Sequence, residues 1–132
     1  MSDMEITFGG NKKINAAFHG FEIKTDQPQS AGGDASAPTP FDLFLASLGT
    51  CAGIFAVGFM QSRKLNTEGF KISLSFDWDE TSHLVKKVNM KMTLPKDFPP
   101  QYKDAILKAT ELCTVKRHLH APPAFEITAV QS

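Results

Sequence analysis

The sequence is short of several features that would place it in a specialised class of protein. It has only two cysteines, and a chain of 132 residues buries enough surface to fold without disulfide bonds. It has no excess charge of either sign, because 14 Lys and Arg residues balance 14 Asp and Glu residues. Binding to nucleic acid, or electrostatic binding to a membrane, needs a positive excess. We therefore expect neither partner, and the absence of net charge permits self-association.

The N-terminus also lacks the pattern of a targeting signal. Residues 1–5 contain neither the basic segment nor the apolar segment that a secretory signal peptide requires. We therefore expect a cytoplasmic protein, in which a permanent structural disulfide is not expected.

No charged residue occurs between Asp42 and Arg63. Thr39, Pro40 and Asp42 form the pattern of a helix start, with a capping threonine, a proline at the first helical position and an acidic residue three positions after the threonine. The apolar residues from Leu43 to Met60 point in every direction around a helical wheel. We therefore expect a helix that is covered on all sides, partly by a second subunit.

A membrane-spanning helix is the main alternative for this apolar segment. Roughly 18 to 20 uncharged residues can cross a bilayer, and Gly49-x-x-x-Gly53 resembles a membrane packing motif. However, small and polar residues interrupt the segment, no aromatic belt flanks it, and amphipathic strands follow it. We therefore expect no membrane span, and we expect the glycines to mark places where another helix approaches closely.

The rest of the chain predicts strands on both sides of this helix and a second helix after it. Alternating apolar and polar residues are the clearest strand signal. A flexible surface loop is predicted over 26–38, a second helix is predicted to end near Cys113, and a last strand is predicted from Ala124 to Val130. The earlier predicted strands are 5–8, 13–18, 21–25, 70–78 and 87–94. The length is that of a single domain, residues 1–132.

The two cysteines lie on helix faces that are expected to be buried. Packing the helices together would bring Cys51 and Cys113 into one pocket, which is the geometry that a thiol peroxidase needs. A reactive cysteine needs a lowered pKa, and Cys51 lies about three turns into its helix, beyond the reach of the helix dipole. We therefore expect a cation near Cys51, from Lys12, Lys13 or the 116–118 segment. The alternative is that both cysteines are small apolar core residues.

The sequence around the cysteines resembles the superfamily of osmotically inducible protein C (OsmC) and organic hydroperoxide resistance protein (Ohr). The resemblance rests on Pro40-x-Asp42-Leu43 before Cys51, and on a second cysteine within residues 111–115. It covers nearly the whole chain. It implies an OsmC-like α+β fold, with antiparallel sheets packed on two central helices, and an intertwined homodimer. It also implies reduction of organic hydroperoxides in defence against oxidative stress, with Cys51 as peroxidatic thiol, Cys113 as resolving thiol and an external dithiol as reductant.

The sequence departs from the most active relatives at two positions. Those relatives carry an arginine after an early Gly-Gly pair and a glutamate directly after the helix-starting proline, whereas this chain has Asn11 and Phe41 there. Asp42, one place later, matches the acidic position of a less characterised branch. The resemblance therefore implies Asp42 as a third site residue, although its pattern is equally that of a helix cap. We expect weak peroxidase activity.

A second function is compatible with the same sequence. The chain could be a non-catalytic OsmC-like dimer that binds a small apolar ligand in a pocket lined by phenylalanines, namely Phe41, Phe44, Phe55 and Phe59. His118-x-His120 near Cys113 offers three potential metal ligands, whereas a structural zinc site usually needs four. We expect that segment to be a polar loop after a helix, and we expect no metal ion and no other cofactor.

Overall fold

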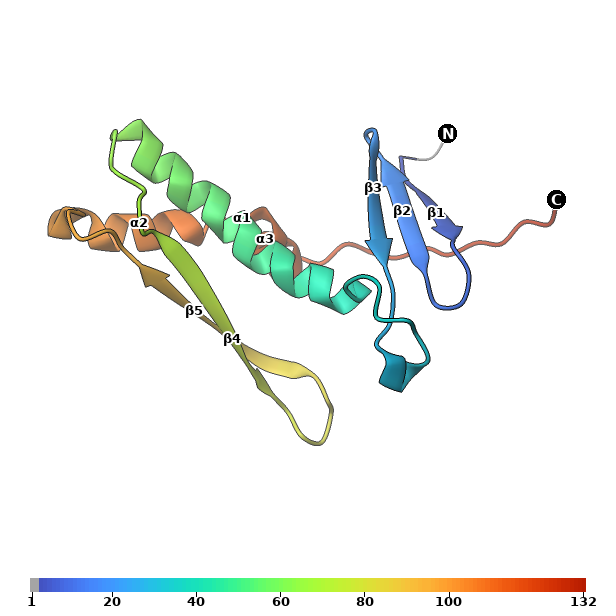
Figure 1. The fold of residues 1–132 in the computed structure, drawn as a ribbon. Coiled ribbons are helices and arrows are strands. Elements are labelled where there is room, and N and C mark those ends of the chain that lie inside the picture. The colour runs from blue at the N-terminus through green and yellow to red at the C-terminus, as the bar shows by residue number, and fades with distance from the viewer. Residues whose placement is uncertain (1–2) are drawn as a thin grey trace. The chain divides into compact units, whose positions relative to one another are not determined.

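The computed structural model describes residues 3–132, which form two compact units with their boundary between Ala46 and Ser47. The first unit contains strands β1 (Glu5–Phe8), β2 (Ile14–Phe18) and β3 (Phe21–Thr25), the 3-10 helix η1 (Gln29–Ala31) and the start of helix α1 (Pro40–Ser62). The second contains the rest of α1, strands β4 (Lys71–Trp78) and β5 (Val85–Thr93), the 3-10 helix η2 (Pro100–Tyr102), and helices α2 (Lys103–Thr110) and α3 (Thr114–His120) (Figure 1). The predicted α+β class with antiparallel sheets is confirmed.

The first unit is built on a three-stranded antiparallel sheet in the order β1-β2-β3. The sheet register places Ile14 opposite both Phe8 and Thr25. The β2–β3 turn consists of His19 and Gly20, with φ values of 50° and 79°. A two-residue hairpin of the favoured type requires positive φ at both positions, which glycine adopts without strain. The three strands and the hairpin agree with the sequence patterns.

The loop between β3 and α1 is organised around Asp26, which is fully buried. Its carboxylate accepts hydrogen bonds from the backbone N–H of Gln27, at 2.7 Å, and from both the hydroxyl and the N–H of Ser36. These donors, the Ser36 hydroxyl foremost, hold the pKa of the Asp26 carboxyl well below its usual range. The predicted surface loop is therefore hydrogen-bonded back onto its own first residue.

The turn between β1 and β2 contacts the same loop through two side chains. The Asn11 amide donates to the carbonyl oxygen of Gly32 at 3.0 Å, and Lys13 forms an ion pair with Asp34. Gly33 sits directly against the backbone of Gln27, where a Cβ atom would collide with the Gln27 carbonyl group. The Gly-rich stretch is thus a close backbone packing site as well as a turn.

Helix α1 begins with the capping arrangement that the sequence predicts. The Thr39 hydroxyl accepts the N–H of Asp42 at 3.1 Å, and the Asp42 carboxylate accepts the N–H of Thr39 at 3.0 Å. The backbone N–H groups of Thr39 and Asp42 are thereby satisfied reciprocally. The side chain of Asp42 is therefore engaged as a helix cap.

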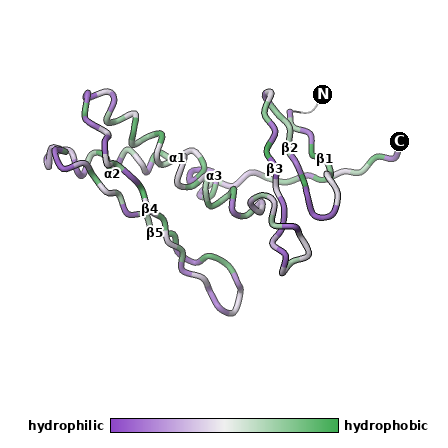
Figure 2. The backbone as a smooth tube through the Cα atoms, viewed as in Figure 1, coloured by the Kyte–Doolittle hydropathy of each residue, from purple (hydrophilic) through white to green (hydrophobic). Residues whose placement is uncertain are grey.

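Only one face of α1 is buried within this chain, although hydrophobic residues recur along its whole length (Figure 2). The buried residues recur every four positions and are Leu48, Ala52, Ala56 and Met60. Ala56 and Met60 join Phe98 and Ile106 in the core of the second unit. By contrast, Ile54 is 65% exposed. A single chain therefore leaves much of the apolar helix uncovered, and the expected cover by a second subunit stays a prediction.

Strands β4 and β5 form a two-stranded antiparallel sheet that packs on this core. Alternate residues of β4, beginning with Ile72, are partly buried, and the polar residues between them are exposed. Ile72 pairs with Met92 and Leu74 pairs with Met90. The predicted alternation is confirmed for β4 as far as Phe76, whereas in β5 Met90 is 44% exposed and Asn89 is partly buried.

The segment after β5 differs from its prediction at Cys113. Helix α2 ends at Thr110, and a separate helix, α3, begins at Thr114 with Cys113 as its N-cap residue. The Cys113 sulfur accepts the backbone N–H of Lys116 at 3.4 Å, as a serine or aspartate cap would. Cys113 therefore starts a helix and does not end one, and the predicted polar loop after it is helical.

The predicted C-terminal strand is wrong for the isolated chain. Residues 121–132 follow α3 without forming a strand, and no residue from 124 to 130 pairs with a sheet. The apolar residues Phe125, Ile127 and Val130 are 86%, 94% and 97% exposed. Their strand-like sequence pattern finds no partner strand in the described part of this chain.

In the part of the chain that the structure describes, α1 is a helix long and apolar enough to cross a membrane, judged by length and composition. A core helix passes the same test. The expectation of no membrane span therefore stays a prediction.

The buried carboxylate of Asp26 generates a pH-dependent prediction. Because its pKa is lowered by folding, Asp26 stabilises the fold above the unfolded pKa of about 3.9, and this contribution is lost as pH falls below that value. We expect Asp26→Ala to lower the thermal midpoint at pH 7, and the difference from wild type to shrink between about pH 5 and pH 2. Asp34→Ala, which breaks an exposed ion pair, is the control and should cost less. Equal losses in the two variants would contradict this role.

Candidate functional site

The second unit brings the two cysteines into contact. Cys51 lies on α1 and is partly exposed, whereas Cys113, at the start of α3, is only 2% exposed. Both are free thiols, and their side chains hydrogen-bond to each other. Two residues 62 positions apart in sequence, by their numbering, therefore share one site.

The start of α3 surrounds the Cys51 sulfur with hydrogen-bond donors. The backbone N–H of Val115 contributes most, followed by the Cys113 thiol and by the N–H and hydroxyl of Thr114. Together they lower the pKa of Cys51, because hydrogen bonds to a thiolate favour the charged form. Burial, together with the shared hydrogen bond, raises the pKa of Cys113. The pair is therefore arranged as a thiolate acceptor at Cys51 and a thiol donor at Cys113.

Hydrogen-bond donors at the start of α3 lower the pKa of Cys51, and the expectation of a nearby cation stays a prediction. Lys13 forms an ion pair with Asp34 within the first unit. Lys116 contributes its backbone N–H to the Cys113 sulfur. Thr114 and Val115 gave no signal in the sequence, because they act largely through their backbone and because cysteine is not among the preferred helix-capping residues.

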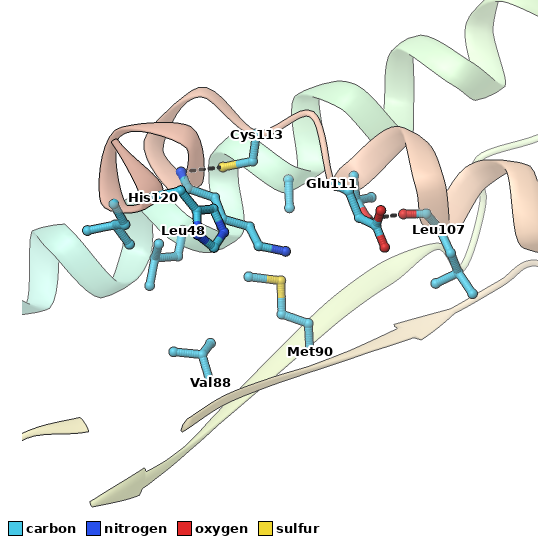
Figure 3. Close-up of a pocket in the computed structure, with 11 residues that line it drawn as sticks. Leu48, Val88, Met90, Leu107, Glu111, Cys113 and His120 are labelled. Atoms are coloured by element: carbon cyan, nitrogen blue, oxygen red, sulfur yellow. Dashed lines mark hydrogen bonds between the residues drawn. The ribbon is translucent and has the colours of Figure 1, made fainter. Parts of the chain in front are cut away.

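A cavity of about 560 Å³ lies next to the cysteine pair (Figure 3). α1, β5, α2 and α3, with the turn between the last two, all contribute to its wall. Its apolar lining residues are Leu48, Ala52, Val88, Met90, Leu107 and Leu119, and its polar ones are Thr110, Glu111, Cys113, Lys116 and His120. Cys113 therefore belongs both to the cavity wall and to the cysteine pair, while Cys51 is the direct neighbour of the lining residue Ala52 in the sequence.

The predicted phenylalanine-lined pocket does not coincide with this cavity. Phe41 and Phe44 stack on each other, with ring centroids 5.6 Å apart, and Phe59 packs edge-on against Tyr102 at 5.9 Å. None of these residues, nor Phe55, lines the cavity. Aliphatic side chains and a methionine form its apolar wall instead. The cavity size nevertheless falls within the range of about 300 to 1,000 Å³ that is typical of small-molecule sites.

The remaining candidate residues have structural partners. Asp42 caps α1, and nothing in the structure tests the catalytic role that the resemblance implies for it. Asn11 holds the loop at Gly32. The His118 imidazole contacts the carbonyl oxygen of Thr114 at 2.8 Å. Among residues 3–132 there is no group of three or more His, Cys, Asp or Glu side chains placed to hold a metal ion.

Comparison with models of protein families shows the family of this chain. The model of the OsmC-like protein family matches residues 32–128, which include α1, both cysteines and the strands between them. The chain belongs to the OsmC-like family. None of the curated proteins matches it in sequence.

Solved structures show that the OsmC-like fold extends over most of the chain. An osmotic stress induced and detoxification response protein from Psychrobacter arcticus has a TM-score of 0.74 and 19% identity, over 89% of this chain and 87% of that one. The OsmC-like protein from Mycoplasma pneumoniae has a TM-score of 0.71 and 14% identity, over 91% and 87%. The organic hydroperoxide resistance protein OsmC from Legionella pneumophila has a TM-score of 0.55 and 16% identity, over 88% and 86%. At these identities the comparisons show the fold.

The opposite pKa shifts predict a difference in thiol reactivity. We expect Cys51 to be alkylated several-fold faster than Cys113 at pH 7, since only the thiolate reacts. The pKa read from the pH dependence of its rate should be lower than that of an ordinary thiol, and the pKa of Cys113 should be higher. Cys113→Ala removes one donor and should raise the pKa of Cys51. Iodoacetamide labelling against pH, resolved by peptide mass spectrometry, measures both rates, and equal rates would refute the assignment.

Two substitutions separate the capping role of Asp42 from a catalytic one. Asp42→Asn keeps an oxygen that can accept the Thr39 N–H but removes the charge, whereas Asp42→Ala removes both. Loss of a helix cap costs about 1 kcal/mol, so Asp42→Ala should lower the free energy of unfolding by about that amount and Asp42→Asn by less. If Asp42 acts only as a cap, Asp42→Asn should also leave the Cys51 alkylation rate unchanged. Urea denaturation and thiol labelling of the two variants distinguish the roles.

Proposed function

We propose that this OsmC-like protein is a thiol-dependent reductase of organic hydroperoxides that acts in defence against oxidative stress. The observation that carries the proposal is the contact between two thiols with opposite pKa shifts beside an apolar cavity. A lowered pKa on a partly exposed cysteine is the usual condition for peroxide reactivity. Membership of the OsmC-like family supports a redox role.

The reaction proposed for the pair has three steps. The Cys51 thiolate attacks the distal oxygen of the hydroperoxide, the O–O bond breaks, and the alkoxide that leaves takes a proton from water to become an alcohol. The Cys113 thiol then condenses with the Cys51 sulfenic acid to give a disulfide and water. An external dithiol reduces the disulfide through a mixed disulfide and restores both thiols. Cys51 is the peroxidatic residue and Cys113 the resolving residue.

The cavity next to the pair supports a preference for organic hydroperoxides. Its wall includes Leu48, Val88 and Leu107, which can bury an alkyl or aryl tail. Each buried methylene contributes about 0.8 kcal/mol, so two or three give a tenfold or greater preference over hydrogen peroxide. Hydrogen peroxide has no tail to bury.

Weak turnover is part of the proposal. Asn11 and Phe41 occupy the positions at which the most active relatives are expected to carry an arginine and a glutamate. Neither residue can form a charge-assisted hydrogen bond to a hydroperoxide as an arginine can. The Asn11 amide is in addition committed to the carbonyl oxygen of Gly32.

Non-catalytic binding of an apolar ligand is the second candidate. The size of the cavity and its mainly aliphatic wall favour it independently of the cysteines. Under this alternative, Cys113 is a buried helix cap and Cys51 a residue of the helix surface. The two functions differ in whether Cys51 is needed for peroxide consumption.

We also propose that the functional protein is a homodimer. α1 leaves Ile54 exposed, and the C-terminal segment exposes Phe125 and Ile127. Exposed apolar segments of this kind mark interaction sites. A second copy would cover the open face of α1 and could pair with the C-terminal segment.

The proposed reaction predicts a defined order of activities among cysteine variants. Wild type with excess dithiothreitol should consume cumene hydroperoxide at least tenfold faster than hydrogen peroxide, because of the apolar cavity. Cys51→Ser should fall to the reagent background, and Cys113→Ser should retain only slow turnover, because no internal thiol resolves the sulfenic acid. The enzyme hypothesis fails if wild type and Cys51→Ser both consume the peroxides at the background rate.

A matched pair of leucines tests whether this cavity holds the substrate. Leu107 is 48% exposed and lines the cavity, whereas Leu112 is 58% exposed and does not. Leu107→Glu should therefore slow cumene hydroperoxide consumption severalfold with little change for hydrogen peroxide. Leu112→Glu should change neither. An equal effect of the two variants would place the substrate elsewhere.

The homodimer predicts a solution mass of twice the 14.5 kDa of one chain across dilution to micromolar concentration. Ile54→Asp should dissociate the dimer, because it places a charge in the apolar face of α1. Gln61→Asp, which adds the same charge at an exposed polar position of α1, is the control. Light scattering after size-exclusion chromatography measures the mass. A stable wild-type monomer at micromolar concentration would sink this proposal.

A further inference from the structure

Met90 places a third sulfur in the cavity that Cys113 lines. It lies on β5 opposite Leu74, and Figure 3 shows its thioether extending from the strand into the cavity. The residue is 44% exposed, so small molecules can reach it. A methionine thioether is oxidised by peroxides to a sulfoxide. The mechanism proposed above makes no use of this group.

The methionines in the described part of the chain differ in their access to an oxidant. Met60 is 0% exposed, and Met92 is only partly exposed and packs against the core. Met4 is 46% exposed, almost the same as Met90, but it is not among the residues that line the cavity. Met4 and Met90 therefore form a matched pair. They are almost equally exposed, but only Met90 lines the cavity.

We propose that Met90 is a site of reversible oxidative modification by the organic hydroperoxides that enter the cavity. The inference rests on the proposed function in one respect, which is that the cavity admits such hydroperoxides. An apolar tail held against the cavity wall raises the local concentration of the peroxide group next to the Met90 sulfur. Met4 meets the same oxidant only from bulk solution.

The reaction is a two-electron oxygen transfer. The thioether sulfur attacks the distal oxygen of the hydroperoxide, an S–O bond forms and the O–O bond breaks. The hydroperoxide proton passes to the leaving alkoxide, so the products are a methionine sulfoxide and an alcohol. No further reactant is needed, and a methionine sulfoxide reductase restores the thioether.

The modification would change the chemistry of the cavity wall. A sulfoxide is polar and chiral, and it would stand beside Leu48 and Val88 where the thioether was apolar. Burial of an apolar tail against a polar group is less favourable. Oxidation of Met90 would therefore weaken binding of the same class of compound that causes it.

The test compares sulfoxide formation at individual methionines in the full chain carrying Cys51→Ser and Cys113→Ser, which removes all thiol chemistry. The protein is treated separately with cumene hydroperoxide and with hydrogen peroxide, and peptide mass spectrometry follows Met4, Met60, Met90 and Met92 at early times. We expect the Met90-to-Met4 ratio to be about tenfold higher with cumene hydroperoxide than with hydrogen peroxide, since two buried methylene equivalents suffice for that factor. Cumyl alcohol should protect Met90 and leave Met4 unaffected. Wild type without reductant gives the same readout if the double variant does not fold.

The outcomes separate this inference from the proposed enzyme. Equal ratios with the two oxidants, or no protection by cumyl alcohol, would overturn the assignment of Met90 even if the peroxidase assay succeeds. A raised ratio in the double variant supports the assignment even if wild type proves to have no peroxidase activity, because the readout needs no cysteine.

Discussion

The close packing of one narrow face of α1 is the constraint on which the rest of the second unit depends. Leu48, Ala52, Ala56 and Met60 form this face, and two of the four are alanines, so neighbouring elements can approach the helix backbone. Gly49 shows how tight the approach is, because a Cβ atom there would lie 3.0 Å from a methyl carbon of Leu74 on β4. Larger residues at these positions would push β4 and α2 away, and the start of α3 would no longer meet Cys51.

Backbone groups make the largest contribution to the lowered pKa of Cys51. N–H groups of Thr114 and Val115 lie at the Cys51 sulfur, and they keep their donor character at every pH at which the protein folds. A lysine or histidine would titrate and would need its own counter-ion. The same helix start buries Cys113 as a protonated neighbour. The first turn of α3 thus lowers the pKa of Cys51, while burial beside it raises the pKa of Cys113.

The extent to which sequence predicted this structure differed between elements for physical reasons. The β4 alternation and the α1 capping pattern are local, and both were predictable because the residues that carry the signal also make the contacts. α3 was not predictable, since its cap is a cysteine and its functional groups are backbone atoms. Asp26 looked like an ordinary loop residue, because its partner Ser36 lies ten positions away. The C-terminal segment has the sequence pattern of a strand, but a strand needs a partner, and its pattern does not say in which chain that partner lies.

Because the N-cap of α3 is a thiol, the stability of the first turn of α3 would depend on the oxidation state of Cys113. Serine, threonine and aspartate caps are chemically permanent, but the Cys113 sulfur that accepts the Lys116 N–H is the atom that a disulfide with Cys51 would engage. Forming that bond would turn the sulfur towards α1 and weaken its hold on the Lys116 amide. Oxidation would therefore weaken the N-cap of α3, and reduction would restore it. The hydrogen bond that would change is the one from the Lys116 N–H to the Cys113 sulfur.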